Sequence, residues 1–195
     1  TLLPGWTETI PEQDASRNKG YYLNEHLTEN RLRKAMAYYY GTISQMDHHV
    51  GRMIEMLKNK GLYDNTIIVY TSDHGDYIGY HHMILKQNYM YDPLVKVPLI
   101  IKYPKQDCAG MVSGALLNNI DVAPTILGKV GCVKGKHMMG IDIFKNPCGS
   151  EFVFAEDRKG QEYMVRDKRF KLLCSCEESK SDRKSVVEGK SLDIG

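Results

Sequence analysis

The feature that most limits the fold of this chain is an apolar stripe that repeats at steps of three and four residues between residues 32 and 57. This spacing places apolar side chains on one face of an α-helix. Thr28 precedes the stripe as a predicted cap, and Gly61 follows it as the predicted end of the helix. The pattern predicts one long helix that packs on a sheet along its apolar face. The stripe consists of Leu32, Met36, Tyr39, Ile43, Met46, Val50, Met53 and Leu57.

A short connection leads from this helix to a compact apolar run at residues 67–70. Its β-branched and aromatic side chains predict a buried strand. The order of helix, short loop and strand is typical of a parallel sheet covered by helices. Further strands are predicted at residues 97–102 and 111–117, and three short runs at residues 151–156, 163–166 and 170–173 predict an antiparallel meander.

A group of polar side chains follows the strand at residues 67–70. Asp73 and His74 come directly after it, Gly75 allows a sharp turn or a close approach, and His81 and Lys86 complete the group. A carboxylate and an imidazole can ligate a divalent cation, while a lysine and a second histidine can hold an anion beside it. This combination of side chains is suited to bind a substrate that is an ester of an oxyanion. Aspartate and glycine taken singly are also common in strand-ending turns, so the argument depends on the whole set.

Composition narrows the classes of partner. The chain has 195 residues, 42% of them hydrophobic, which is enough for a substantial core. Its net charge of +2 is too small to indicate nucleic acid or an anionic membrane surface as a partner. No apolar run approaches the roughly 18 residues that a membrane span needs. Five scattered cysteines do not make a disulfide framework and assign no compartment.

The polar group also carries a family resemblance. The run TSDHGD at residues 71–76, GYH at 79–81, Lys86 and KVPLI at 96–100 resemble the sulfatase family of the alkaline-phosphatase-like superfamily. The likeness extends over about residues 3–173 and is strongest to iduronate-2-sulfatase and related carbohydrate sulfatases. It implies an α/β fold, a partial alkaline-phosphatase-like sandwich in which helices flank a sheet, with a small antiparallel C-terminal sheet.

The resemblance also suggests a division of the chain. Residues 1–27 are expected to form a surface loop segment, and residues 28–145 the C-terminal part of the catalytic α/β domain. Residues 146–176 are expected to form part of a small β subdomain. Residues 177–195 are polar and weakly patterned, and residues 182–195 resemble a translated sequencing adapter, so we expect a disordered, non-native tail.

The resemblance implies a chemistry as well. Sulfatases use a formylglycine nucleophile, made from the first residue of a Cys/Ser-x-Pro-x-Arg motif, beside a divalent cation that is usually Ca²⁺. Asp73 and His74 match the second pair of metal ligands in the family. Lys86 matches the lysine that contacts the sulfate and assists the leaving oxygen, and His81 matches an active-site histidine. The implied substrate is a sulfated small molecule or carbohydrate.

One departure from the family pattern is important. No cysteine or serine of this chain stands in an x-Pro-x-Arg context, and the family's first acidic pair of metal ligands has no match. We therefore expect the C-terminal half of an enzyme, inactive alone, with the formylglycine outside this chain. The family suggests a secreted, periplasmic or lysosomal full-length protein, but the sequence assigns no location.

Two alternatives remain open. An imidazole ligand suits Mn²⁺ or Zn²⁺ better than Ca²⁺, which favours a phosphodiesterase or phosphonate monoester hydrolase of the same superfamily. The other alternative is a non-catalytic module that binds a glycan or a protein on the same fold. Retention of Asp73, His74, His81 and Lys86 together argues against a mere binding module.

Overall fold

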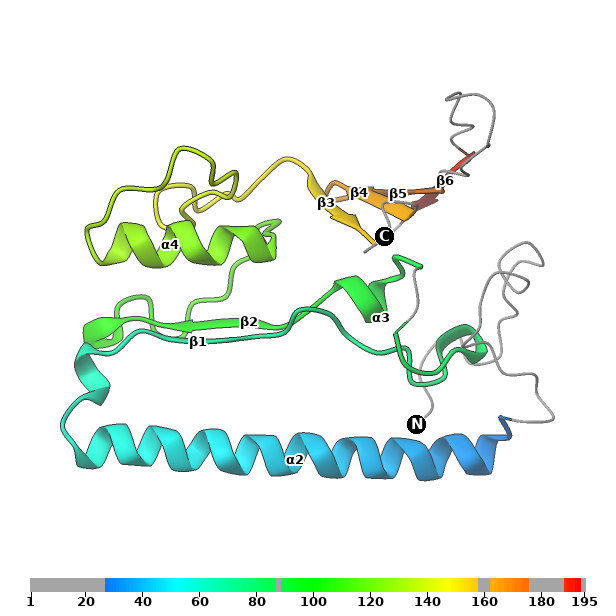
Figure 1. The fold of residues 1–195 in the computed structure, drawn as a ribbon, viewed down its shortest axis with the longest axis horizontal. Coiled ribbons are helices and arrows are strands. Elements are labelled where there is room, and N and C mark those ends of the chain that lie inside the picture. The colour runs from blue at the N-terminus through cyan, green and yellow to red at the C-terminus, as the bar shows by residue number, and fades with distance from the viewer. Residues whose placement is uncertain (1–26, 87–88, 158–161, 176–187, 194–195) are drawn as a thin grey trace. The chain divides into compact units, whose positions relative to one another are not determined.

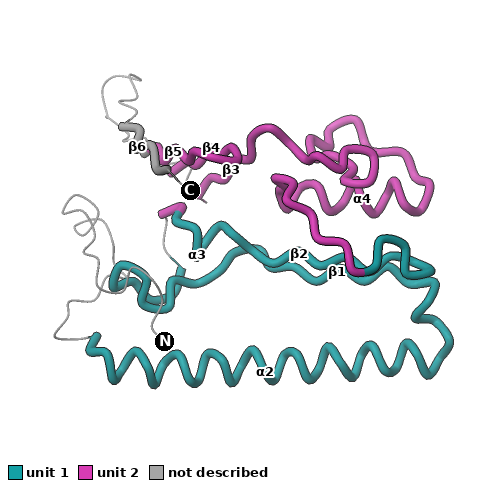
Figure 2. Tube along the Cα trace, turned by 180° about the vertical axis from the view of Figure 1, so that it is seen from behind, with its two compact units in different colours: residues 1–87, 91–109 teal, residues 88–90, 110–195 magenta. Residues whose placement is uncertain are grey.

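The computed structural model describes residues 27–86, 89–157, 162–175 and 188–193. They belong to two compact units, residues 1–87 with 91–109 and residues 88–90 with 110–195 (Figure 2). The division expected after residue 145 falls inside the second unit. The expected surface loop at residues 1–27 lies outside the described residues except for Leu27, whose side chain is buried.

The first unit contains the long helix that the apolar stripe predicts. Helix α2 covers Glu29–Asn59, and the hydroxyl of Thr28 accepts a hydrogen bond from the N–H of Arg31, as expected of its cap. Gly61 follows the helix with a φ of 66°, a left-handed conformation that glycine adopts at little cost. The helix and both of its predicted ends are therefore confirmed.

The stripe on α2 is buried only near its beginning. Leu32 and Met36 belong to a buried cluster with Leu27, against which Ile78 and Ile84 pack. Farther along the helix, Ile43, Met46 and Met53 are exposed. The prediction that the stripe packs along its whole length is wrong for the described part of the chain, because the loop that covers α2 reaches only its first turns.

Two short strands follow α2. Strand β1 covers Ile68–Thr71 and strand β2 covers Leu99–Lys102. They lie side by side in Figure 1 and pair antiparallel, with Ile68 opposite Lys102 and Thr71 opposite Leu99. The parallel arrangement predicted from the helix–strand order is wrong. A parallel neighbour usually needs a crossover helix, whereas the described chain between β1 and β2 forms only single helical turns at Tyr80–His82 and α3, Asp92–Val95.

The second unit begins with irregular chain and a short helix. The strand predicted at residues 111–117 is replaced by a single bridge between Leu116 and Gly149. Helix α4 covers Val122–Lys129. Asp121 is buried before it, and its carboxylate accepts hydrogen bonds from the N–H groups of Asn118 and Ile141.

The C-terminal sheet is antiparallel, as predicted. Its strands run in the order β3, β4, β5 and β6 along the sheet (Figure 1). Their bounds are Val153–Glu156, Glu162–Arg166, Phe170–Ser175 and Glu188–Asp193. Strand β6 lies in the segment expected to be a disordered tail, so that expectation does not hold at residues 188–193. Backbone hydrogen bonding to the edge of β5 requires no apolar pattern, which is why composition does not predict it. The remaining residues of the expected tail lie outside the described ranges.

The α/β fold class with a small antiparallel C-terminal sheet is thus confirmed. Across the described residues, no helix is both long and apolar enough to cross a membrane.

Unequal burial along α2 makes a testable prediction. Leu32 is 1% exposed and Met53 is 56% exposed, although both lie on the same stripe. We expect Leu32→Ala to lower the free energy of unfolding by about 2–5 kcal/mol through the cavity it leaves. Met53→Ala should change it by about 0.5 kcal/mol or less. Urea unfolding of both variants tests this, and equal losses would contradict the described packing.

Candidate functional site

Asp73 and His74 lie just beyond the end of β1, next to each other in space as well as in sequence. Oδ2 of Asp73 lies 3.6 Å from Nε2 of His74. The other carboxylate oxygen, Oδ1, accepts a hydrogen bond of 3.0 Å from the backbone N–H of His74. That bond is the main cause that lowers the pKa of Asp73, with the nearby His74 ring adding to it. The carboxylate is largely exposed and therefore available to a ligand.

The hydrogen bonds of His74 define its tautomer. Nδ1 lies 2.9 Å from the carbonyl oxygen of Gly75, which can only accept, so Nδ1 carries the proton. Nε2 lies 3.1 Å from Nζ of Lys86, which as an ammonium can only donate. In this tautomer the lone pair of Nε2 is directed at Lys86. A neutral imidazole nitrogen with a free lone pair is the form that binds metals.

Gly75 is required at its position by close packing. A Cβ atom there would lie 2.0 Å from the carbonyl oxygen of Pro93. The N–H of Gly75 donates a 2.7 Å hydrogen bond to the carbonyl of Leu94. The predicted close approach is thus made to the backbone around α3, and it holds the turn beside His74.

The loop between Gly75 and Lys86 carries backbone strain. Ile78, His81, His82 and Leu85 all have φ between 43° and 63°, in the left-handed region that non-glycine residues avoid. Each such residue costs roughly 1–3 kcal/mol and persists only where surrounding contacts hold it. Strain of this kind is common in loops that position functional groups.

His81, predicted as an active-site residue and not as a metal ligand, packs beside two aromatic rings. Its ring centroid is 4.2 Å from that of Tyr80 and 5.2 Å from that of Tyr91. Within the ranges that the structure describes, no three His, Cys, Asp or Glu side chains could together hold a metal ion. The structure therefore brings together Asp73, His74 and Lys86, and places His81 among aromatic rings.

Asp73 and His74 still fit a divalent cation as two of its ligands. Such ions bind imidazole nitrogen and carboxylate oxygen at roughly 2.0–2.6 Å, so two atoms 3.6 Å apart can lie on one ion. A complete shell of four or more ligands needs additional donors.

Sequence reasoning did not identify a contact between α2 and this loop. The hydroxyl of Tyr39 donates a 3.3 Å hydrogen bond to Oδ2 of Asp76. Burial raises the pKa of Tyr39, and the charge of Asp76 raises it further. The available signal was the polar tip of Tyr39 on an otherwise apolar stripe, since a half-buried tyrosine hydroxyl generally has a partner.

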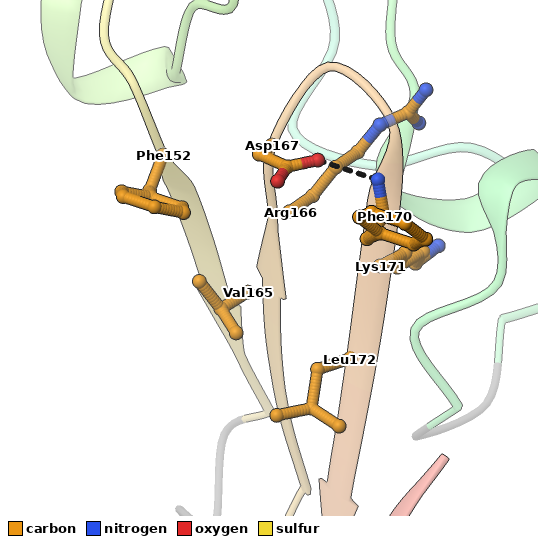
Figure 3. A pocket seen from close by; sticks show the side chains of 7 residues that line it. All are labelled: Phe152, Val165, Arg166, Asp167, Phe170, Lys171 and Leu172. Atoms are coloured by element: carbon orange, nitrogen blue, oxygen red, sulfur yellow. Dashed lines mark hydrogen bonds between the residues drawn. The ribbon is translucent and has the colours of Figure 1, made fainter. Parts of the chain in front are cut away.

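The second unit has a separate hollow on the C-terminal sheet, with a volume of about 160 Å³. In Figure 3, Arg166 extends away from Phe152, Val165 and Leu172. Asp167 accepts hydrogen bonds from the N–H groups of Arg169 and Phe170, which lower the pKa of this carboxyl. These bonds close the turn between β4 and β5, and we assign the hollow no chemistry. It is lined by Phe152, Val165, Arg166, Asp167, Phe170, Lys171 and Leu172.

Comparison with protein families gives a match over residues 5–132 to the family described as Sulfatase, a range that includes all four predicted site residues. N-acetylglucosamine-6-O-sulfatase of Bacteroides thetaiotaomicron is 37% identical over 126 residues, which are 65% of this chain and 22% of that protein. Ulvan-active sulfatase of Formosa agariphila is 30% identical over 175 residues, covering 86% of this chain and 28% of that protein. The chain thus spans less than a third of the length of either relative.

Solved structures resemble the chain over most of its length. One protein, solved in complex with its substrate D-glucosamine-2-N,6-O-disulfate, has a TM-score of 0.71 and 30% identity, covering 84% of this chain and 35% of that one. A phosphonate monoester hydrolase from Silicibacter pomeroyi also has a TM-score of 0.71, with 26% identity, covering 86% of this chain and 36% of that one.

The buried His82 of the loop predicts a pH dependence of stability. Burial, with a smaller contribution from the charge of His81, holds the pKa of His82 below its ordinary value. The unfolded chain takes up this proton near pH 6.5, so it binds more protons than the folded chain below that pH. The neutral His82 therefore makes its full contribution to the free energy of unfolding above about pH 6.5. This contribution is lost as pH falls through the pKa that His82 has in the folded chain. The free energy of unfolding, measured with urea, should fall less with decreasing pH for His82→Gln than for the wild type. His49→Gln, which replaces an exposed histidine, should follow the wild type. Identical pH profiles for all three proteins would contradict this prediction.

Proposed function

Because this chain belongs to the sulfatase family, we propose that it forms part of an enzyme that hydrolyses sulfate esters of carbohydrates with the help of a divalent metal ion. One observation carries the proposal. Nε2 of His74 lies 3.1 Å from Nζ of Lys86 and 3.6 Å from Oδ2 of Asp73. An ammonium beside two metal-ligating atoms is the arrangement that a sulfate on a cation requires.

Asp73 and His74 are the proposed metal ligands. The carboxylate of Asp73 is ionised at neutral pH, its pKa being lowered further by the hydrogen bond from the N–H of His74, and His74 presents the lone pair of Nε2. Its Nδ1–H is anchored on the carbonyl of Gly75, which is how metal-binding histidines are commonly oriented. A bound divalent ion supplies Lewis-acid polarisation of the sulfate oxygens.

Lys86 is the proposed anion contact. The lone pair of Nε2 can serve only one partner, so a metal at His74 leaves all three N–H donors of Lys86 for an anion. Lys86 then neutralises negative charge on the sulfate and on the departing alcohol oxygen as that charge develops. His81 is proposed as a further active-site residue, with its ring orientation set by Tyr80 and Tyr91.

The nucleophile is proposed to come from residues outside these 195. The family's usual nucleophile is a formylglycine made within Cys/Ser-x-Pro-x-Arg, and no cysteine or serine here precedes such a sequence. The chain also spans only 22% and 28% of two sulfatase relatives. We therefore propose that this chain alone does not turn over sulfate esters.

A sulfated carbohydrate is the proposed substrate class. Relatives are named for N-acetylglucosamine 6-O-sulfate and ulvan, and a structural neighbour was solved with a sulfated glucosamine. The second candidate is phosphonate monoester hydrolysis, which is favoured by the nitrogen ligand of His74 and by the structural similarity to such a hydrolase.

Substitutions in the full-length enzyme test the proposal. We expect Asp73→Ala and Lys86→Ala each to lower kcat/KM for sulfate release from a 6-O-sulfated glucosamine by roughly 10²-fold or more. The matched control is Lys34→Ala, because Lys34 is an exposed lysine of α2 in the first unit. Removing divalent ions with a chelator should abolish turnover, and adding them back should restore it.

The outcomes separate the candidates. A Lys86→Ala enzyme as active as the wild type would remove Lys86 from the mechanism. Efficient hydrolysis of a phosphonate monoester without release of sulfate would favour the second candidate instead. Turnover of neither ester by an intact fold would support a binding module.

A further inference from the structure

The site loop is held firmly at its downstream end. The N–H of Gly79 donates to the carbonyl of Met83 at 2.7 Å, and the N–H of Tyr77 donates to the carbonyl of Leu85 at 3.3 Å. The side chains of Tyr77 and Met83 are fully buried. These contacts fix residues 77–85, but they do not by themselves fix the turn that carries Asp73 and His74.

The turn is held at its upstream end by contacts on both sides of His74. The hydroxyl of Ser72 donates a 2.7 Å hydrogen bond to the carbonyl of His74. The N–H of Gly75 donates a hydrogen bond to the carbonyl of Leu94. The carboxylate of the next residue, Asp76, accepts a hydrogen bond from the hydroxyl of Tyr39 on α2. Tyr39 therefore contacts the chain two residues beyond the proposed metal ligand.

Tyr39 has a defined position relative to the loop because the beginning of α2 packs against the loop. Leu32 lies two helical turns before Tyr39, on the same face of α2. A Cβ atom at Gly79 would lie 2.5 Å from a methyl group of Leu32, so the loop backbone packs directly on this side chain. Leu32 and Tyr39 thus contact the two ends of one loop segment, residues 76–79, from one rigid helix.

We propose that Tyr39 and Asp76 are positioning residues of the site: their hydrogen bond holds the turn so that Nε2 of His74 faces Lys86 beside the carboxylate of Asp73. This inference rests on the proposed function, in which Asp73 and His74 ligate the ion. Tyr39 acts through Asp76 and touches neither ion nor substrate. Its raised pKa keeps the phenol protonated, and so able to donate, well above neutral pH.

The first test reads the ring of His74 by ¹⁵N NMR of the 195-residue chain. In the wild type the ¹⁵N shifts should report the Nδ1–H tautomer, since Nδ1 donates to Gly75 and Nε2 accepts from Lys86. Tyr39→Phe keeps the ring and removes only the hydroxyl, and it should give a mixture of both tautomers. Tyr38→Phe is the matched control, because it removes the hydroxyl of an adjacent tyrosine that is 70% exposed.

Variants at Asp76 provide the rescue. Asp76→Asn retains an oxygen that accepts from Tyr39 and should keep the wild-type tautomer, whereas Asp76→Ala should behave like Tyr39→Phe. The double variant with Tyr39→Phe and Asp76→Ala should be no worse than either single variant, because both remove the same bond. Unchanged thermal unfolding of Tyr39→Phe would separate positioning from a general loss of stability.

The second test measures Mn²⁺ binding by calorimetry to the full-length enzyme carrying the same substitutions, because Asp73 and His74 supply only part of a ligand shell. Loss of a partner behind a metal ligand generally weakens binding by about 10- to 100-fold. We expect such a loss for Tyr39→Phe and Asp76→Ala, and no loss for Tyr38→Phe or Asp76→Asn.

The two tests fail in different ways. A wild-type full-length enzyme that binds no Mn²⁺ would count against the proposed metal site, while the NMR comparison would still decide the role of Tyr39. If Tyr39→Phe matches Tyr38→Phe in tautomer, and also in affinity wherever Mn²⁺ binds, the positioning role is wrong.

Discussion

The contact between Leu32 of α2 and the backbone at Gly79 is the constraint on which the rest of the site depends. Gly79 has a φ of 95° and no side chain, so Leu32 can pack against the loop at a distance that any other residue would prevent. The same helix face then presents Tyr39 to Asp76. A helix that is mostly exposed along its middle is thus anchored at the end where the loop needs it.

This anchoring explains how a strained loop can hold exposed chemical groups in place. Asp73 is 86% exposed on its side chain, and Lys86 is also exposed, so neither is fixed by burial. Interactions between such exposed charges are weak and are screened by salt. Their geometry must therefore come from the backbone, which is held by Tyr77 and Met83 in the core and by the hydrogen bond of Gly75 to Leu94.

The sequence predicts well those features that depend on neighbours along the chain. The period of the stripe and the cap at Thr28 give α2, and the order of Asp73, His74 and Lys86 identifies three groups that meet. Features that depend on the path of the chain are not predicted. The direction of β2 depends on the path of the described chain at residues 72–86 and 89–98. The exposure of Met53 depends on how far the loop reaches along α2.

His81 illustrates the same difference. Its place in the sequence predicts an active-site residue, and its backbone at a φ of 49° together with the rings of Tyr80 and Tyr91, which the spacing does not predict, sets where the imidazole lies. The bond between Tyr39 and Asp76 joins residues far apart in sequence and has no local signature. Helical periodicity alone assigns Tyr39 to packing, whereas in the structure its hydroxyl also serves the loop.

The most direct test of the central claim, that Asp73, His74 and Lys86 form one cation and anion site, is paramagnetic broadening by Mn²⁺. Mn²⁺ broadens the NMR signals of nuclei close to where it binds. At substoichiometric Mn²⁺, the account predicts that signals of Asp73, the His74 ring and the Lys86 side chain broaden first, and that Asp73→Ala suppresses the effect. Broadening that begins instead at the exposed His48 and His49 of α2, with residues 73–86 unaffected, would contradict it.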